Sequence, residues 1–415
     1  MTKIDTCNSY RRTVLDNGLR IVTEHIPHIR SLAIGFWFDV GSRDEPDDLA
    51  GIAHFIEHMN FKGTPLRSAA AIARQIEGRG GHLNAFTGKE NTCYHARIVD
   101  QQLPKAIDIL SDITQNSVFD SDEINRERKV ILEELKSVED TPDELVFEYF
   151  IAQMFNPHSM GRSVLGKRDK LETIDHNVLV DYREKHYGGS RAVIAAAGNL
   201  DHNRLVKMIE RRFSSRSTVG QSRKPPSDKI TEKTRQDLHT NTQQTHICWG
   251  CRSFSYKDPR KFSLLVLNTL LGGGMSSRLF QTIRERHGLA YTVFSFIETY
   301  LDTGLFGVYA GTEPKQAEKT LRMIKKELMG LVRKPVSNRT LQRTKDQLKG
   351  NLILGLESAG NRMHRLAKME LYNTDWLSLD DIVSRIDAVT VEDVQAVACD
   401  LFEQRTGYTT ILWPN

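Results

Sequence analysis

The sequence predicts an α+β protein made of two duplicated halves, each a mixed or antiparallel β-sheet with helices packed on one face. Three observations favour this fold class. The chain has 415 residues, which is too long for one ordinary core. Residues 214–235 are polar, lack periodicity and carry a Pro pair, so we predict a linker there. The flanking segments 1–213 and 236–415 repeat one order of elements, which indicates an internal duplication.

The expected elements follow the same order in both halves. The first half has an apolar strand, two helices and a β-rich stretch, at residues 31–41, 51–61, 68–81 and 82–99. The second half has the same four elements at residues 246–254, 261–274, 276–288 and 291–311. Later helices follow Pro104 and Pro314, and each half ends on an apolar strand. Because strands and helices do not alternate regularly, α+β is expected rather than a doubly wound fold.

Composition excludes several classes of protein. Apolar residues make up 39% and charged residues 27% of the chain, so we expect a folded protein. The formal net charge of +4 is too small to suggest nucleic acid as a partner. There is no apolar run of about 18 residues and no signal-peptide centre, so no membrane partner is expected. These features predict a bacterial-type cytoplasmic protein, although a mature mitochondrial matrix enzyme would look the same.

Five scattered cysteines fit a reducing compartment better than a disulfide framework. Cys248 and Cys251 form the one CxxC pattern, which could indicate a redox or zinc site. Their flanks predict a strand, however, and residues three apart in a strand face opposite sides. We therefore predict a structural role for both.

His54 and His58 are the strongest candidate metal ligands. They lie four residues apart in a helical pattern, so both point from one face, together with Glu57. Neutral imidazoles are normal zinc ligands, and a neighbouring carboxylate can take a proton from a water activated by the metal. The motif His54-Phe55-Ile56-Glu57-His58 is HExxH in reverse, and it predicts a zinc site with Glu57 as general base and a third ligand elsewhere.

The third ligand is expected from the helix at residues 121–140. The apolar stripe of this helix takes in two glutamates, because it runs through Ile124, Glu127, Ile131, Glu134 and Val138. A buried carboxylate is costly without a cation or hydrogen-bond donors, so this pattern favours a metal nearby. We predict Glu134 as the ligand and Glu127 as a carboxylate that orients a histidine or balances charge. Glu133 lies about 100° away around the helix and is expected to face solvent.

Other polar residues favour structural interpretations. Three candidates in the β-rich stretch lack ligand spacing and are expected to be polar or packing residues: His82, Glu90 and His95. An acidic turn is expected to be solvated, with contact to a basic substrate as the alternative; it contains Asp44, Glu45, Asp47 and Asp48.

The motif HFIEH, followed by Glu134 at 76 positions after His58, resembles the zinc peptidases of the pitrilysin and insulinase superfamily. The resemblance is greatest to the mitochondrial-processing-peptidase-like branch and covers nearly the whole chain. It also includes the segments LDNGLRIV, GIAHFIEHMNFKGT, LNAFT and LGGGMSSRLFQTIRERHGLAYTV. The resemblance implies that His54, His58 and Glu134 bind zinc, that Glu57 is the general base and that Glu127 is an additional acidic residue near the metal.

The resemblance also implies substrate contacts from both halves. Arg284 and Tyr291 match an Arg and a Tyr with which family members reach the bound substrate and the developing oxyanion. Without the resemblance, a surface Arg and a packed Tyr would be expected. Four residues match an edge strand on which the peptide is laid, namely Leu83, Asn84, Ala85 and Phe86. Such a strand can hydrogen-bond any extended backbone.

The two halves are expected to divide the work. An offset of 208 residues places the zinc motif on apolar residues, with His54, Glu57 and His58 falling on Phe262, Leu265 and Val266. The second half is therefore expected to lack a metal site and to form the other wall of a chamber.

The predicted function is a zinc-dependent endopeptidase that hydrolyses unstructured peptides or N-terminal extensions in an enclosed chamber, with Zn²⁺ as cofactor. Its expected partners are peptides in extended conformation and a second copy in a homodimer, with a hetero-oligomer as the alternative. A competing hypothesis is a non-catalytic scaffold or peptide-binding subunit of the same fold, because the resembling branch includes subunits with degraded metal motifs. The complete ligand set and the Arg284 and Tyr291 pair favour the enzyme.

Overall fold

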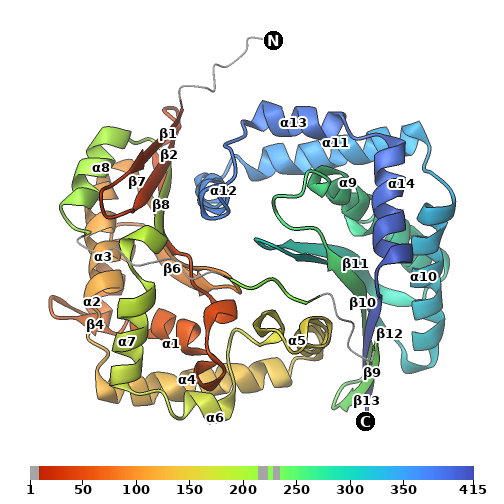
Figure 1. Cartoon of the computed structure of the whole chain (residues 1–415), viewed down its shortest axis with the longest axis horizontal. Coiled ribbons are helices and arrows are strands. Elements are labelled where there is room, and N and C mark those ends of the chain that lie inside the picture. Colours follow the sequence, from red (N-terminus) through yellow and green to blue (C-terminus); the bar gives the residue numbers. More distant parts are fainter. Residues whose placement is uncertain (1–8, 214–222, 228–233) are drawn as a thin grey trace. The chain divides into compact units, whose positions relative to one another are not determined.

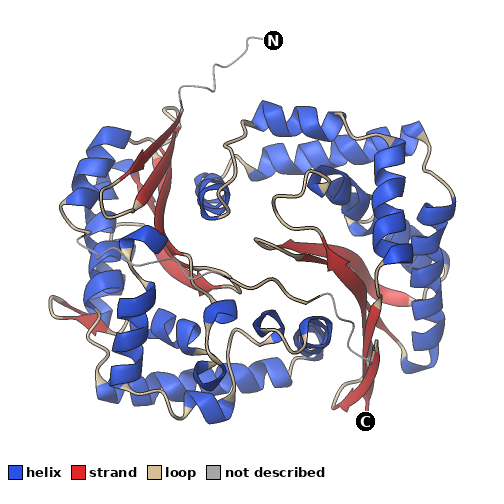
Figure 2. Ribbon diagram, in the orientation of Figure 1, coloured by secondary structure: helices blue, strands red, loops and turns tan. Residues whose placement is uncertain are grey.

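The computed structural model describes residues 9–213, 223–227 and 234–415 (Figure 1). The chain divides into two units, each built around one large sheet (Figure 2). The first unit comprises Met1–Glu134, Arg162–Arg223 and Leu354–Ser378. The second comprises Leu135–Gly161, Lys224–Ile353 and Leu379–Asn415. The predicted linker at 214–235 lies mostly outside the described residues.

The sheet of the first unit has six strands in the order β1-β2-β8-β3-β7-β6. The strands are β1 (Tyr10–Val14), β2 (Arg20–His25), β3 (Ser31–Phe38), β6 (His82–Thr87), β7 (Thr92–Val99) and β8 (Ala192–Gly198). A small hairpin is formed by β4 (Gly63–Thr64) and β5 (Arg67–Ser68). Both β3 and β8 are almost continuously apolar, because strands in the middle of a sheet covered on both faces have no solvated side.

The sheet of the second unit repeats this arrangement. Its order is β11-β12-β10-β13-β9, which is the order β6-β7-β3-β8-β2 of the first sheet. The pair β2 and β8 is parallel, and so is the matching pair β9 and β13. The strands are β9 (Arg235–Thr240), β10 (Thr245–Ser253), β11 (Ala290–Thr299), β12 (Gly304–Thr312) and β13 (Tyr408–Pro414). The predicted duplication and α+β fold class are confirmed.

The helices of the first unit cover both faces of its sheet, so the expectation of helices on one face is wrong for this unit. They are α1 (Ile52–Met59), α2 (Ala69–Glu77), α3 (Leu103–Asn116), α4 (Ser121–Glu139), α6 (Arg168–Leu171), α7 (His176–His186), α8 (His202–Glu210) and α12 (Ala359–Leu371). In Figure 1, α3 and α8 lie on one side of this sheet, and α12, from the second half of the sequence, covers the opposite face. The close approach of α12 requires Gly35 in β3, because a Cβ atom there would lie 2.7 Å from Met363 Sδ.

The helices of the second unit are α5 (Pro142–Phe155), α9 (Lys261–Gly272), α10 (Ala317–Arg333), α11 (Asn338–Gly355), α13 (Leu379–Asp387) and α14 (Val391–Cys399). Of these, α5 packs on β10 and β13, where Phe150 and Met154 join the core of the second sheet. A π-helical segment, Phe280–Arg286, precedes β11.

The two halves of the sequence exchange one helix. Helix α5 precedes the predicted linker but belongs to the second unit, and α12 follows the linker but belongs to the first. In the first half, α5 is the third α-helix after β7. In the second half, α12 is the third α-helix after β12, which is the matching strand, so the exchange is reciprocal. The duplication is thus continuous in sequence, while the units in space are not.

Cys248 and Cys251 both lie in β10, are buried and are not bonded in a disulfide. The predicted strand at this CxxC pattern is therefore confirmed. Burial raises the pKa of both thiols, which disfavours the thiolate form needed for redox or metal chemistry. Within the described residues, no helix has the length and apolar character needed to cross a membrane.

Candidate metal centre

Helix α1 carries the zinc motif, and its first turn is held in place by a buried carboxylate. Glu45 Oε2 accepts the backbone N–H of Gly51 at 2.8 Å, and Oε1 accepts that of Ala53 at 2.9 Å. These bonds satisfy free N–H groups at the helix start. Gly51 has φ +99° and lies against the backbone of Gly166, so only a glycine fits this entry to the helix.

His54, His58 and Glu134 converge from α1 and α4. Glu134 Oε2 lies 3.8 Å from His54 Nε2 and 3.6 Å from His58 Nε2. The possible ligand atoms of the three side chains all lie within 4.8 Å of one another. Zn–N bonds of about 2.0 Å with tetrahedral angles place neighbouring ligand atoms about 3.3 Å apart. A small movement of these side chains would therefore complete three zinc bonds.

The chemistry of these donors also fits zinc. Burial, reinforced by the neighbouring His58, lowers the pKa of His54 to about 3, so its imidazole is neutral and can donate a lone pair. Two imidazoles and one carboxylate form a ligand set found in catalytic zinc sites, which leaves a coordination position open. The residues present thus fit the metal that the sequence predicts.

Glu127 lies behind His58 rather than beside the ligand atoms. Its Oε2 is 3.0 Å from His58 Nδ1, and its Oε1 is 2.7 Å from Lys62 Nζ. An imidazole that donates Nδ1–H to a carboxylate keeps Nε2 as the metal-binding atom. This is the geometry of the histidine-orienting role predicted for Glu127. Glu133 is exposed, as expected from its position on the helix.

The side chain of Glu57 extends from α1 toward the end of strand β6. Its Oε2 accepts a hydrogen bond from Thr87 Oγ1 at 2.5 Å, and Thr87 is the last residue of β6. Burial raises the pKa of Glu57 above its usual range, partly offset by the Thr87 bond. A carboxylate with a raised pKa can accept and release a proton nearer neutral pH.

Strand β6 is an edge strand, as expected from the resemblance of residues 83–86 to an edge strand that binds peptide. In the sheet order, β7 is its only neighbour among the described strands. Leu83, Asn84, Ala85 and Phe86 all lie in β6, with alternating exposure along the strand. The N–H of Ala85 donates to Asn84 Oδ1 at 2.9 Å, so one backbone donor of the strand is bonded to the preceding side chain.

Arg284 and Tyr291 lie together in the second unit. The guanidinium carbon of Arg284 is 4.7 Å from the centre of the Tyr291 ring, which is a cation–π contact. Arg284 belongs to the π-helical segment Phe280–Arg286, and Tyr291 lies in the edge strand β11. Tyr291 is 74% exposed, so the packed tyrosine expected from these residues alone is wrong.

The acidic turn is less solvated than expected. Glu45 is buried at the start of α1, and Asp44 is buried in a bidentate contact with Arg223, at 2.7 and 2.8 Å. Glu90 is also buried, 2.5 Å from Arg43 Nη1. Ion pairs explain Asp44 and Glu90, and backbone hydrogen bonds explain Glu45, without a catalytic role.

Two site residues were missed by the sequence analysis, Lys62 and Thr87. Lys62 lies in the turn after α1, where its N–H donates to Met59 O, so helical spacing does not predict its contact with Glu127. No local signal predicts the contact of Thr87 with Glu57, because it joins two elements 30 residues apart. In the second unit, α9 carries the apolar residues Phe262, Leu265 and Val266 where α1 carries the motif.

Comparisons with known proteins identify the family of this chain. Residues 20–168 match the family model described as Insulinase (Peptidase family M16), and residues 173–348 match that of the Peptidase M16 inactive domain. The duplicated fold and the matched family models place the chain in a class of peptidases. The chain belongs to the insulinase peptidase family M16, as the resemblance in the sequence implied.

Curated relatives and solved structures extend over nearly the whole chain. An uncharacterized zinc protease of Streptomyces coelicolor is 40% identical over 408 residues, covering 97% of this chain and 89% of the relative. An uncharacterized zinc protease of Bacillus subtilis is 38% identical over 399 residues, covering 95% and 96%. A protease from Helicobacter pylori has a TM-score of 0.91 at 23% identity, covering 98% of this chain and 99% of its own. A peptidase M16 inactive domain from Pseudomonas fluorescens has the same TM-score at 18% identity, covering 98% of each chain. The two structures show the same fold.

Proposed function

We propose that this protein is a zinc endopeptidase that hydrolyses unstructured peptides or N-terminal extensions in an extended conformation. The observation that carries the proposal is the convergence of His54, His58 and Glu134 beside the half-buried carboxylate of Glu57. Three ligands, an open coordination position and an adjacent base are the parts that metal-assisted hydrolysis requires.

Each residue has a distinct task in this proposal. When bound, zinc would polarise the scissile carbonyl and lower the pKa of the attacking water. Glu57 takes the proton from that water and later delivers it to the leaving amine. Thr87 donates to Glu57 Oε2 and so holds this carboxylate in one orientation. Glu127 fixes the His58 ring through Nδ1.

Strand β6 supplies the binding surface for the peptide. Because β6 has an open edge, an extended backbone can add to it as a further strand, with little dependence on the side chains of the substrate. Thr87 at the end of β6 contacts Glu57, so a peptide on this strand would lie next to the base. The bond from Ala85 N–H to Asn84 Oδ1 would be exchanged for a bond to the substrate.

Arg284 and Tyr291 act on the same substrate in this proposal. The phenol of Tyr291 donates to the developing oxyanion, and Arg284 orients the ring from its face while contacting the peptide. Hydrolysis then needs both halves of the chain. Because one chain carries both sets of residues, a homodimer is proposed as the assembly, and a cytoplasmic location is part of the same proposal.

The test is the substitution Glu57→Gln in the full chain. The variant should retain zinc, measured by metal analysis of the dialysed protein, because the ligands are unchanged. Its kcat/KM on a quenched, basic, unstructured peptide should fall by roughly 100- to 10,000-fold, the usual contribution of a general base. Glu133→Gln, an exposed carboxylate on α4, is the matched control and should cleave normally.

Undiminished cleavage by Glu57→Gln would overturn the mechanism. If the zinc-loaded wild type does not cleave, and a chelator changes nothing, the scaffold hypothesis is favoured instead. Loss of zinc in His58→Ala, together with loss of cleavage, would connect the metal to the activity.

A further inference from the structure

We infer that Arg223 is a positioning residue for the carboxylate of Glu57. The inference rests on the proposed function, because Glu57 acts as a base only in that proposal. Arg223 lies in the stretch 214–235 that the sequence predicts as a linker, yet it belongs to the first unit and its side chain is only 7% exposed. It is connected to Glu57 through residues 41–45, here called the 41–45 segment, which contact both the end of strand β6 and the start of helix α1.

The guanidinium of Arg223 makes four polar contacts within the first unit. Its Nε and Nη2 donate to the two carboxylate oxygens of Asp44, at 2.8 and 2.7 Å. Nη1 lies 2.7 Å from Asp39 Oδ1, and Nη2 also donates to the backbone oxygen of Glu90 at 2.7 Å. The side chain of Asp44 is 2% exposed. Because a paired Arg–carboxylate contact fixes the orientation of both groups, Arg223 holds Asp44 in one position.

The 41–45 segment is bonded to the connection that follows strand β6. The backbone N–H of Ser42 donates to Gly88 O at 3.1 Å. The backbone N–H of Arg43 donates to Lys89 O at 2.8 Å. The connection between β6 and β7 begins directly after Thr87, the last residue of β6. The position of the end of β6 therefore depends on the 41–45 segment.

The same segment is bonded to the start of helix α1. Glu45, its last residue, accepts two backbone N–H groups at the start of α1, at 2.8 and 2.9 Å. Helix α1 carries Glu57, whose Oε2 accepts the hydroxyl of Thr87 at 2.5 Å. The base and its hydrogen-bond partner thus lie on two elements that are both fastened to the 41–45 segment. Asp44 lies within this segment, so the contact of Arg223 with Asp44 stabilises the placement of both elements.

The expected consequence concerns the geometry of the base. A hydrogen bond weakens steeply when its partners move apart or lose alignment. A displacement of about 1 Å in a reacting group can cost roughly 100-fold in rate. Loss of the Arg223 guanidinium leaves the zinc ligands in place but removes one restraint on the distance between Glu57 and Thr87. We therefore expect a smaller effect than that of removing the base itself.

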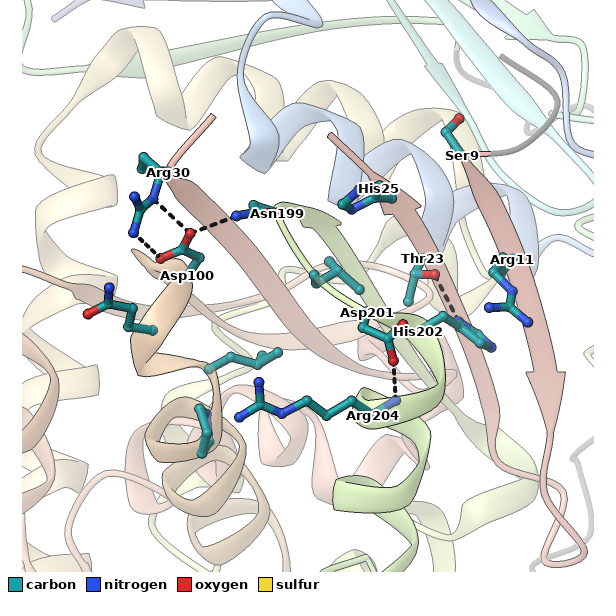
Figure 3. A pocket seen from close by; sticks show the side chains of 14 residues that line it. Ser9, Arg11, Thr23, His25, Arg30, Asp100, Asn199, Asp201, His202 and Arg204 are labelled. Carbon is teal, nitrogen blue, oxygen red and sulfur yellow. Dashed lines mark hydrogen bonds and ion pairs between the residues drawn. The ribbon is translucent and has the colours of Figure 1, made fainter. Parts of the chain in front are cut away.

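Another arginine–aspartate contact of the first unit shows the contrast (Figure 3). Arg30 and Asn199 both donate to Asp100 Oδ2, at 2.9 and 2.8 Å, beside a cavity of about 530 Å³. The side chain of Arg30 is 72% exposed, and exposed ion pairs contribute little to stability. Asp100 follows strand β7 at the end remote from residues 88–91. This contact is therefore expected to have no effect on Glu57.

The experiment is a double-mutant cycle in the zinc-loaded full chain, with Arg223→Met, Thr87→Val and both together. Arg223→Met should lower kcat on the quenched peptide roughly tenfold, with KM within about twofold, because the peptide can still add to β6. In the Thr87→Val background, Arg223→Met should lower kcat by less than about twofold, because the contact through which Arg223 acts is already absent. Effects that simply multiply, or a wild-type kcat in Thr87→Val, would overturn the inference.

Two further arginines are the controls. Arg67 is the matched one, because its side chain is 10% exposed and contacts both Asp108 and Asp112 in the first unit. Arg67→Met should also lower the free energy of unfolding but leave kcat within about twofold, and Arg30→Met should change neither. An equal loss of kcat in Arg67→Met and Arg223→Met would assign the effect to general destabilisation and overturn the inference.

Arg223→Lys is the second variant, for use if Arg223→Met does not fold. It keeps a positive charge near Asp39 and Asp44 but lacks the planar fork that binds Asp44 through two N–H bonds. Its kcat should fall severalfold while the protein remains folded. A wild-type kcat in Arg223→Lys would show that charge alone is sufficient, and would overturn the positioning role.

Amide hydrogen exchange tests the same contacts without peptidase activity. In Arg223→Met or Arg223→Lys, the amides of residues 41–45 and 88–91 should exchange at least about tenfold faster than in the wild type, whereas Arg67→Met should leave them unchanged. Unchanged exchange in both Arg223 variants would overturn the inference. If the zinc-loaded wild type does not cleave the peptide, the proposed function fails, and the exchange measurement still decides whether Arg223 fixes the elements around Glu57.

Discussion

The Nδ1 atom of His58 lies 3.0 Å from Glu127 Oε2, and this contact orients the imidazole toward Glu134. The second oxygen of Glu127 is held by Lys62 at 2.7 Å. The carboxylate is buried and fixed at both oxygens, so the ring of His58 has one favoured tautomer and one direction.

The substitution Glu127→Gln should therefore weaken zinc binding without removing a ligand. An amide can still accept one hydrogen bond but carries no charge, so zinc affinity should fall by roughly 10- to 100-fold. Competition with a chromophoric chelator measures this directly. Glu133→Gln on the same helix is the control, and an equal loss there would show that general charge rather than orientation is responsible.

Tyr291→Phe should lower the chemical step rather than peptide binding. The substitution keeps the ring against Arg284 and removes only the hydroxyl. Loss of one oxyanion donor should reduce kcat by roughly 100-fold or more, with KM little changed. Steady-state kinetics on the quenched peptide would show the split. Tyr149→Phe, at another exposed tyrosine of the second unit, should behave as wild type, and an unchanged kcat in Tyr291→Phe would remove the phenol from the mechanism.

Gly51→Ala should destabilise the protein and weaken zinc binding together. A Cβ atom at Gly51 would lie 2.9 Å from Gly166 Cα, and the residue has φ +99°. Gly80 is the matched control, because it has φ +73° but a Cβ atom there meets nothing within 4 Å. Gly80→Ala should cost about 1 kcal/mol in free energy of unfolding, and Gly51→Ala clearly more. Urea denaturation and zinc competition measure both effects; equal losses would contradict the steric argument.

His186 should make the free energy of unfolding fall in acid. It is 3% exposed and accepts a hydrogen bond from Arg191 at Nδ1, at 2.7 Å. Burial and the positive Arg191 lower its pKa to about 4. Because the unfolded chain binds this proton near pH 6.5, the stability due to neutral His186 is complete above pH 6.5 and is lost as pH falls toward 4.

The slope from this one proton is at most about 1.4 kcal/mol per pH unit. His186→Asn keeps an acceptor for Arg191 and cannot titrate, so urea unfolding at several pH values should give a flatter profile. His28→Asn, at an exposed position, is the control. A variant profile as steep as that of the wild type would assign the acid sensitivity to other groups.

Local periodicity in the sequence was enough to predict most of the residues of the site. Helical spacing placed His54, Glu57 and His58 on one face of α1, and the apolar stripe of α4 placed Glu127 and Glu134 on a second common face. The distances in the structure agree with both faces meeting. Local periodicity does not predict contacts between segments that are distant in sequence. Three such contacts are those of Thr87 with Glu57, Arg223 with Asp44, and Met363 with Gly35.

The sequence by itself determined the repeated order of strands and helices, because hydrophobic periodicity and the 208-residue offset are properties of the chain alone. It also determined which half carries the metal residues. Only the tertiary structure decided that α5 and α12 each pack on the sheet of the other half. The apolar residues of a helix show that it must be buried but do not name the surface that buries it, and burial is non-directional. The choice of sheet depends on shape complementarity, such as the space that Gly35 leaves for Met363.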